Sequence, residues 1–276
     1  MASQKYALIG SPVSRSLSPL IYNTAFAFTN LQGSYEALEV SGSTLEDVIS
    51  RLRMGYAGFN VTAPVKERTV DFLDEASDEV NAIGAVNTVR ITDSRLHGFN
   101  TDWIGFSHAI GNAELDGKSV IILGAGGSAK AVVYALLRQH RPRRIQIMNR
   151  TRARAEQLIR GFQKLAPCTA LENVSQRDVK EEIALVVQTT SASTPEYSPV
   201  EVNFFKNIGI AFDLVYEDTL FLRQARSAGC RTVGGLRMLV GQAAEAFRIY
   251  TGMPCPEEAV LSVLVKAKAY DGTYIQ

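Results

Sequence analysis

Two segments place a lysine and an aspartate where α/β proteins commonly bind ligands. Lys66 follows the strand-like segment 58–62 and Pro64, and we expect it in the first turn of a helix. Asp102 comes at the end of a second strand-like segment, 96–99, just before the point where we expect the chain to enter another domain. Ligands of such folds bind beyond the carboxyl ends of strands, where the two side chains could act as general acid and base. Taken singly, the lysine could also be a solvated residue at a helix start and the aspartate a helix N-cap.

A glycine-rich turn in the middle of the chain indicates a dinucleotide site. Residues 124–129 read Gly-Ala-Gly-Gly-Ser-Ala, and they follow the apolar run 120–123 and precede a helix-like segment. Gly124 allows a tight turn, Gly126 lets a pyrophosphate approach the backbone, and the helix N-terminus directs N–H groups at the phosphates. Ala129 takes the third glycine position, where close packing of strand and helix tolerates a methyl group. The alternative is a glycine-rich loop without a ligand, which the flanking strand and helix make less favourable.

The end of the next expected strand, 144–148, predicts which dinucleotide is bound. An NAD site would have an acidic residue there to bond the ribose hydroxyls. The chain instead continues Asn-Arg-Thr-Arg-Ala-Arg, which places Arg150, Arg152 and Arg154 at a helix start. Cations are unfavourable at a helix N-terminus, and guanidinium groups bind a phosphate through charge-assisted hydrogen bonds. The sequence therefore favours NADP over NAD, although the arginines could also simply be solvated.

Strand-like and helix-like segments alternate along the chain, which is typical of an α/β fold. We predict two domains with a cleft between them: an N-terminal α/β substrate domain, residues 1–103 with 239–276, and a Rossmann-like doubly wound NADP domain, residues 104–238. The Asp93-Ser94-Arg95 turn suggests a hairpin. The expected strands are 6–9, 34–40, 58–62, 85–92, 96–99, 118–123, 144–148, 183–187 and 208–212. The expected helices are 20–29, 45–54, 65–73, 128–138, 152–163, 238–250 and 257–270.

Composition excludes several classes of protein. The 276 residues carry 29 Lys+Arg against 28 Asp+Glu, a net charge of 29 − 28 = +1, so the basic surplus of a general nucleic-acid binder is missing. No stretch approaches the ~20 apolar residues that span a bilayer, and the N-terminus lacks the pattern of a secretory signal. The three cysteines and three histidines have no metal-site spacing. We expect a cytoplasmic protein without a metal, nucleic-acid or membrane partner.

Several ordered motifs resemble those of the shikimate dehydrogenase family, from about Tyr6 to Gly252. The motifs are Gly-Ser-Pro-Val-Ser-Arg-Ser-Leu-Ser-Pro at 10–19, Asn-Val-Thr with Pro64 and Lys66 at 60–66, Gly-Ala-Val-Asn-Thr at 84–88, Asn-Thr-Asp at 100–102, the glycine turn, Asn-Arg-Thr at 149–151, and Met-Leu-Val with Gln242 at 238–242.

The resemblance implies an NADP-dependent oxidoreductase acting on a CH–OH group, which reversibly reduces 3-dehydroshikimate to shikimate in aromatic amino-acid biosynthesis. Lys66 and Asp102 match the family's catalytic pair. The implied substrate-binding residues are Ser16, Ser18, Asn60, Thr62, Asn87, Tyr216 and Gln242. The implied cofactor-binding residues are Gly124, Ala125, Gly126, Gly127, Ser128, Ala129, Asn149, Arg150, Thr151, Arg154, Leu214 and Gly235.

This chemistry suits the side chain of Lys66. Hydride transfer to a ketone develops negative charge on the oxygen, which the ammonium can stabilise and protonate. In the reverse direction the lysine must be neutral to accept the proton, so we expect alcohol oxidation to be favoured at alkaline pH. Asp102 would orient the ammonium and a ring hydroxyl.

The chain departs from the family pattern in places that leave substrate preference open. Arg15 replaces a common histidine, Gly234 replaces a frequent aspartate, residues 188–193 replace a usual Asn-Ala-Thr-Ser-x-Gly stretch, and the segment after Tyr216 looks shortened. One alternative is a quinate/shikimate dehydrogenase that uses NAD or both cofactors. Another is a catalytically silent relative that binds the metabolite. We expect small-molecule partners and a monomer or homodimer.

Overall fold

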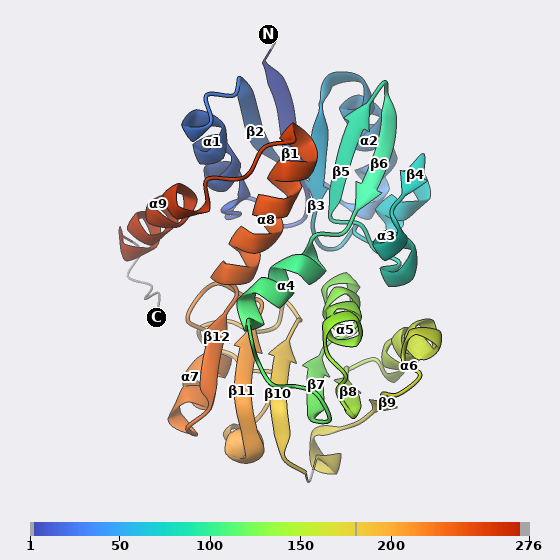
Figure 1. Cartoon of the computed structure of the whole chain (residues 1–276), viewed down its shortest axis with the longest axis vertical. Coiled ribbons are helices and arrows are strands. Elements are labelled where there is room, and N and C mark those ends of the chain that lie inside the picture. Colours follow the sequence, from blue (N-terminus) through green and yellow to red (C-terminus); the bar gives the residue numbers. More distant parts are fainter. Residues whose placement is uncertain (1–2, 180, 271–276) are drawn as a thin grey trace. The chain divides into compact units, whose positions relative to one another are not determined.

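The computed structural model describes residues 3–179 and 181–270, which form two compact units. The first unit comprises Met1–Gly105 and Val240–Gln276, and the second comprises Phe106–Leu239. Each unit is built on its own β-sheet with helices packed against it (Figure 1). The predicted α/β fold class is confirmed.

The first unit contains a mixed sheet with the strand order β2-β1-β3-β5-β6-β4. The central strand β1 pairs in parallel with β2 and β3, whereas β5 is antiparallel to both β3 and β6. Residues 6–10 of β1 are buried, which explains their continuous apolar run. The strands are β1 (Gln4–Gly10), β2 (Gly33–Glu39), β3 (Gly58–Val61), β4 (Glu75–Ala76), β5 (Thr88–Thr92) and β6 (Arg95–Phe99).

The predicted hairpin between β5 and β6 is confirmed. Thr92 pairs with Arg95, and the two residues between them, Asp93 and Ser94, have φ angles of 53° and 58°. Positive φ at both central positions is the mark of a type I′ turn, whose twist matches that of the flanking strands. The hairpin fixes the direction of β6, whose end leads to Asp102.

Helices of the first unit bury one face against this sheet. A core of aliphatic side chains, among them Ile9, Ile49, Val61 and Val89, lies between α2 and the strands. Helix α1 contacts β1, β2 and α9. The helices with residues in this unit are α1 (Ser18–Phe28), α2 (Leu45–Gly55), α3 (Asp78–Ile83), α4 (Asp102–Ile110), α8 (Leu236–Thr251) and α9 (Glu257–Tyr270), with 3₁₀ turns η1 (Gly42–Thr44) and η2 (Arg68–Phe72).

The predicted helix over residues 65–73 is wrong. Only η2 forms, and residues 63–67 make turns before it. The carbonyl of Lys66 accepts a hydrogen bond from the N–H of Val86 (3.0 Å), while the N–H of Val70, its partner in an α-helix, donates to the carbonyl of Glu67 (3.3 Å). Lys66 therefore lies in a loop that is tied to the strand region near Asn87, and not in a helix.

The second unit contains a sheet whose paired strands are all parallel, in the order β12-β11-β10-β7-β8-β9. This is the doubly wound, Rossmann-like arrangement that the sequence predicted. Every residue of β7 is buried, as expected of a parallel strand covered on both faces. The strands are β7 (Ser119–Leu123), β8 (Arg144–Met148), β9 (Ala170–Asn173), β10 (Ile183–Gln188), β11 (Ile208–Asp213) and β12 (Arg231–Gly234).

Helices follow several of these strands, and α5 continues directly from the glycine turn after β7 (Figure 1). Helix α5 buries Ala129, Val132, Val133 and Leu136. Helix α6 packs on β8 and β9, and α7 packs on β11 and β12. These elements are α5 (Gly127–Gln139), α6 (Arg152–Phe162) and α7 (Leu220–Ser227), with 3₁₀ turns η3 (Gln163–Leu165), η4 (Gln176–Asp178) and η5 (Val202–Asn207).

Glu181 links the beginnings of several strands in the second unit. Its carboxylate accepts hydrogen bonds from Arg143 (2.5 Å), Arg144 (3.0 Å) and Gln146 (2.9 Å). Burial by itself raises the pKa of this carboxyl, but a hydrogen bond from Ser119 and the charges of the two arginines outweigh it, so the pKa lies below its ordinary value. The ionised form therefore stabilises the fold.

We expect a Glu181→Gln variant to unfold in urea with a free energy about 1–2 kcal/mol below that of the parent at pH 7. Because the folded pKa lies below the unfolded one, the carboxylate contributes above about pH 4.5, and its contribution is lost as the pH falls through the folded pKa. The difference between the two proteins should therefore shrink at pH 3. Glu182→Gln, at the neighbouring exposed position, is the control and should change little. If the difference in the free energy of unfolding between the parent and the Glu181→Gln variant stayed constant from pH 7 to pH 3, the electrostatic explanation would be wrong.

Candidate active site

A buried ion pair between Lys66 and Asp102 forms the centre of the candidate site in the first unit. Lys66 Nζ donates to Asp102 Oδ2 at 2.6 Å, and the two side chains are only 13% and 8% exposed. Asp102 is the first residue of α4, and its N–H donates to Asn100 Oδ1 at 3.1 Å. Because Asp102 Oδ1 also accepts from Asn87 Nδ2 at 2.9 Å, the carboxylate that binds the ammonium is itself held in place, in a poorly solvated environment. Such an environment strengthens electrostatic interactions with a bound ligand.

Asn87 organises the groups around this pair. Its Nδ2 group, with two N–H bonds, lies within hydrogen-bond distance of three acceptors: Asp102 Oδ1 (2.9 Å), Thr101 Oγ1 (3.0 Å) and Gln242 Oε1 (3.2 Å). Its Oδ1 accepts from the N–H of Thr101 at 2.7 Å. The structure thus brings Gln242, from α8, to residues that precede β5 and follow β6. Four predicted site residues, Lys66, Asn87, Asp102 and Gln242, form one connected polar cluster. Sequence reasoning omitted Thr101, although its place beside Asp102 in the Asn-Thr-Asp motif was a usable signal.

Asn60 lies on β3, and its side chain is connected to this cluster by hydrogen bonds to Asn87 and Thr88. Its Oδ1 accepts from Tyr35 Oη (2.8 Å), and its Nδ2 donates to the carbonyl of Asn87 (3.1 Å) and to Thr88 Oγ1 (3.0 Å). Both N–H groups of the amide are therefore used within the protein. Thr62 follows β3, and its methyl group lies against Gly10, where a Cβ would come within 2.3 Å of Thr62 Cγ2.

Ser16 and Ser18, two of the predicted substrate-binding residues, lie at the start of α1. Ser16 Oγ donates to Ser18 Oγ at 3.2 Å, and the N–H of Ser18 donates back to Ser16 Oγ at 3.2 Å. Glu39 holds the preceding loop, because its Oε2 accepts from the N–H of Val13 at 3.1 Å. A hydrogen bond from the Ser11 side chain and this backbone bond lower the pKa of Glu39. Two hydroxyl groups at a helix N-terminus are suited to binding an anion.

The glycine turn of the second unit leaves space for a phosphate above its backbone. Gly126 is the N-cap of α5, and a Cβ built on it would meet no heavy atom within 4 Å. Gly124 has φ +117°, and a Cβ there would lie 2.4 Å from Thr189 Oγ1, so only glycine fits. The N–H groups of the first helical turn, at Gly127, Ser128 and Ala129, have no acceptor within the helix. Ala125 is buried between the two glycines. This arrangement can hold a pyrophosphate.

The arginines after β8 lie at the start of α6. Asn149 Nδ2 donates to the carbonyl of Thr151, the N-cap of α6, at 2.8 Å. Arg152 is paired with Glu156 (2.9 Å), whereas Arg150 and Arg154 are exposed and form no ion pair with any residue that the structure describes. Since the N–H of Gly124 donates to the carbonyl of Met148 at 2.8 Å, the glycine turn is tied to the strand that precedes these arginines. Arg150 and Arg154 can therefore bind a phosphate without breaking an ion pair.

The remaining predicted cofactor residues, Leu214 and Gly235, lie against each other in the second unit. A Cβ on Gly235 would lie 2.0 Å from the carbonyl oxygen of Leu214, and the N–H of Gly235 donates to the carbonyl of Val215 at 3.2 Å. Only glycine permits this approach. Tyr216, a predicted substrate residue, lies in the same loop after β11 and is partly buried.

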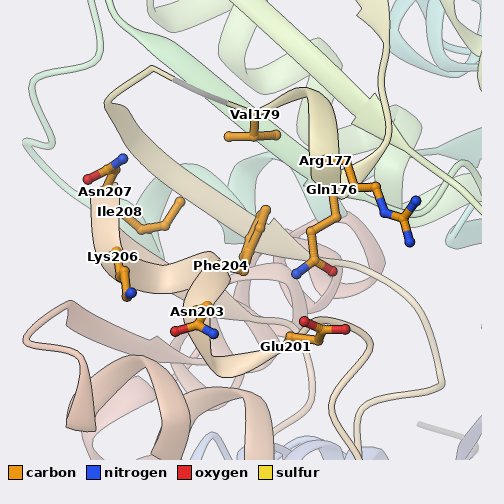
Figure 2. A pocket seen from close by; sticks show the side chains of 9 residues that line it. All are labelled: Gln176, Arg177, Val179, Glu201, Asn203, Phe204, Lys206, Asn207 and Ile208. Atoms are coloured by element: carbon orange, nitrogen blue, oxygen red, sulfur yellow. The ribbon is translucent and has the colours of Figure 1, made fainter.

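The second unit also has a surface pocket, whose lining side chains are drawn in Figure 2. It opens near Ile208, the first residue of β11, whereas the glycine turn follows the last residue of β7. Since β7, β10 and β11 run in parallel, the pocket lies at the amino ends of the strands and the glycine turn at their carboxyl ends. None of the predicted site residues lines it. The lining residues are Gln176, Arg177, Val179, Glu201, Asn203, Phe204, Lys206, Asn207 and Ile208.

The described residues contain neither a group of three or more His, Cys, Asp or Glu that could hold a metal ion nor a helix long and apolar enough to cross a membrane.

Models of known protein families match three stretches of the chain. The shikimate dehydrogenase substrate binding domain matches residues 8–89, the shikimate / quinate 5-dehydrogenase model matches 107–208, and the shikimate 5'-dehydrogenase C-terminal domain matches 235–265. The shikimate dehydrogenase (NADP(+)) of Salinibacter ruber is 38% identical and covers 95% of this chain and 97% of its own. The chain belongs to the shikimate dehydrogenase family. The resemblance predicted from the motifs is confirmed.

Solved structures of family members have the same fold. The shikimate 5-dehydrogenase of Thermus thermophilus, in complex with NADP(H) and shikimate, is 36% identical with a TM-score of 0.85, over 96% of this chain and 99% of its own. The shikimate 5-dehydrogenase of Listeria monocytogenes, in complex with shikimate and NAD, is 30% identical with a TM-score of 0.83, over 95% and 96% of the two chains.

Proposed function

We propose that this chain is an NADP-dependent shikimate dehydrogenase that reversibly reduces 3-dehydroshikimate to shikimate, a step in aromatic amino-acid biosynthesis. The observation that carries the proposal is the buried Lys66–Asp102 pair, held by Asn87 and connected to Gln242. This cluster occurs in a chain whose family members, matched over nearly their whole length, carry the name of this activity. It supplies the proton donor that reduction of a ketone requires.

The second unit fits a phosphorylated dinucleotide. The open space at Gly126, together with the N-terminus of α5, suits the pyrophosphate, and Arg150 and Arg154 suit the 2′-phosphate. Leu214 and Gly235, in the loops after β11 and β12, line another part of the dinucleotide site. When bound, NADPH supplies a hydride to the ketone and NADP⁺ accepts one from the alcohol.

Lys66 moves the proton that accompanies the hydride. In the reduction, the ammonium Nζ donates a proton to the ketone oxygen as that oxygen gains negative charge, which yields the hydroxyl group and a neutral lysine. In the oxidation, neutral Nζ accepts the hydroxyl proton. Asp102 orients Nζ through its 2.6 Å contact, so its role is to hold the amine in position for the transfer of the proton.

The rest of the cluster would recognise the substrate. Ser16 and Ser18 bind its carboxylate at the start of α1, while Thr62, Asn87 and Gln242 of the same unit contact the ring. Asn60 has no free N–H group to offer a ligand, because both are already bonded within the protein. It can offer a ligand only an acceptor position on Oδ1, and its main effect is to hold Asn87 and Thr88 in place.

The deciding experiment is a spectrophotometric assay of the purified full chain that crosses shikimate and quinate with NADP and NAD. We expect turnover of shikimate with NADP and much slower turnover in the other three combinations. Comparable rates with quinate or NAD would instead support the quinate/shikimate dehydrogenase alternative, for which the Listeria relative solved with NAD is a precedent. Binding of shikimate without turnover of any pair would support a silent relative.

Arg150 is expected to select the cofactor. An Arg150→Ala variant should lose about 10–100-fold in kcat/KM with NADP and change less than about threefold with NAD, because a charge-assisted phosphate contact is worth about 1.5–3 kcal/mol. Steady-state kinetics with both cofactors measures the ratio. Arg160→Ala, at an exposed position near the end of α6, the helix that follows Arg150, is the control. A parallel loss with both cofactors would mean that Arg150 does not contact the 2′-phosphate.

A further inference from the structure

A fully buried carboxylate, Asp213, lies at the end of β11 in the second unit and is outside the predicted set of site residues. Its side chain is inaccessible to solvent, and within the described part of the chain it forms no ion pair. Burial raises the pKa of this carboxyl, although hydrogen bonds partly oppose that effect. A buried acid without a cation is costly unless several donors satisfy it, so its retention requires an explanation.

Three hydrogen bonds converge on Asp213 from two different loops. Its Oδ2 accepts from Ser193 Oγ (2.6 Å) and from Thr219 Oγ1 (2.7 Å), and its Oδ1 accepts from the N–H of Val215 (3.0 Å). Ser193 belongs to the loop after β10, while Val215 and Thr219 belong to the loop after β11. Thr219 is also the N-cap of α7, where its hydroxyl accepts from the N–H of Leu222. The carboxylate therefore joins the two loops and the start of a helix.

These loops carry backbone positions of the cofactor site. The residue after Asp213 is Leu214, whose carbonyl lies against Gly235 so closely that no Cβ fits between them. The loop after β10 follows Gln188, which pairs with Asp213 across the sheet, and Thr189 in this loop lies against Gly124 of the glycine turn. A change in the orientation of either loop would thus alter the surface that the dinucleotide meets.

We propose that Asp213 is a positioning residue for the cofactor: its carboxylate fixes the loops after β10 and β11, and thereby the backbone at Leu214 and Gly235. The inference rests on the proposed function, because it assumes that this edge of the second unit binds NADP. It assigns to the carboxylate no contact with the substrate or the cofactor. Ser193 occupies the position of a usual glycine in the family stretch at 188–193, so one of the three donors is a feature of this chain.

An Asp213→Asn variant tests the proposal. The amide keeps an acceptor for Val215 but turns N–H groups toward the hydroxyls of Ser193 and Thr219, which then lose the acceptor for their own protons. We expect the Kd for NADP, measured by calorimetric titration of the full chain, to rise about tenfold, because bonds to a charged acceptor are among the stronger ones. Asp218→Asn removes a partly exposed carboxylate from the same loop and should leave the Kd within about twofold.

A second pair of variants separates positioning from a general loss of stability and remains informative if Asp213→Asn does not fold. Thr219→Ser keeps the hydroxyl and should bind NADP like the parent, whereas Thr219→Val keeps the shape and should raise the Kd by about threefold to fivefold. An unchanged Kd in Asp213→Asn, or equal Kd values in the two Thr219 variants, overturns the inference alone. A parent protein that binds NADP but does not turn over shikimate contradicts the proposed reaction and leaves this test intact. A parent that does not bind NADP overturns both.

Discussion

Replacing Lys66 with alanine should lower kcat for shikimate oxidation by about 10³-fold, since a positioned general acid or base contributes about 10²–10⁴ to such a rate. The variant loses the group that accepts the hydroxyl proton, while Asp102 keeps its bond from Asn87. The KM for NADP should stay within about threefold, because Lys66 and the glycine turn belong to different units. Steady-state kinetics followed by the absorbance of the reduced nicotinamide measures both quantities.

A Lys66→Arg variant distinguishes proton transfer from charge. The guanidinium can still pair with Asp102, so the fold and the local charge are kept, but arginine does not release a proton in proteins. We expect it to be nearly as slow as the alanine variant. Lys5→Ala, at an exposed position on β1, should match the parent. If Lys66→Arg retained most of the activity, the lysine would act only through its charge and the assignment of the proton would be wrong.

A Gly126→Ser variant should bind NADP about 100-fold more weakly without losing stability. The space above Gly126 is open in the protein alone, and serine is a favoured N-cap that exceeds glycine by a few tenths of a kcal/mol. The melting temperature should therefore be equal to that of the parent or slightly higher. With NADP, the added side chain would hold the pyrophosphate away from the backbone, and loss of two hydrogen bonds to a charged group, at about 1.5 kcal/mol each, weakens binding by about 100-fold. Thermal melts and calorimetric titration measure the two effects separately.

The neighbouring glycine supplies the contrast. Gly124→Ala places a Cβ at φ +117° and 2.4 Å from Thr189 Oγ1, so it should lower the free energy of unfolding by about 1–3 kcal/mol in addition to weakening cofactor binding. If Gly126→Ser bound NADP as tightly as the parent, the dinucleotide would not approach this turn. The cofactor site would then have to be placed elsewhere on the second unit.

Local sequence patterns correctly predicted those strands and turns whose formation depends on the residues within the segment itself. The apolar run at 120–123 followed by glycines predicted β7 and the turn into α5, because a parallel strand buried on both faces is apolar throughout. The turn residues Asp93-Ser94-Arg95 predicted the hairpin, in which Asp93 and Ser94 have positive φ angles. The ordered motifs also identified the family.

Elements held mainly by tertiary contacts were misjudged or missed. The segment 65–73 has helical spacing, yet the bond from Val86 to the carbonyl of Lys66 interrupts it. The short elements α3, β4 and β9 were absent from the prediction, because two to six residues carry too little periodicity to be recognised. Helix α7 was also missed, although Thr219 caps it. Contacts with strands distant in the sequence stabilise these segments: β4 pairs with β6, β9 pairs with β8, and α7 packs on β11 and β12.

The sequence by itself determined the chemical inventory of this protein: a lysine, an aspartate, a pair of serines, a glycine turn and two arginines suited to an anion. Only the tertiary structure decided which of them meet. Lys66 and Asp102 are 36 residues apart and Asn87 and Gln242 are 155 apart, yet hydrogen bonds join them. The order β3-β5-β6 and the packing of α8 bring these residues together. Strand order and helix packing depend on the burial of apolar surface over the whole unit. For this reason no local sequence pattern could show that both N–H groups of the Asn60 side chain are hydrogen-bonded within the fold.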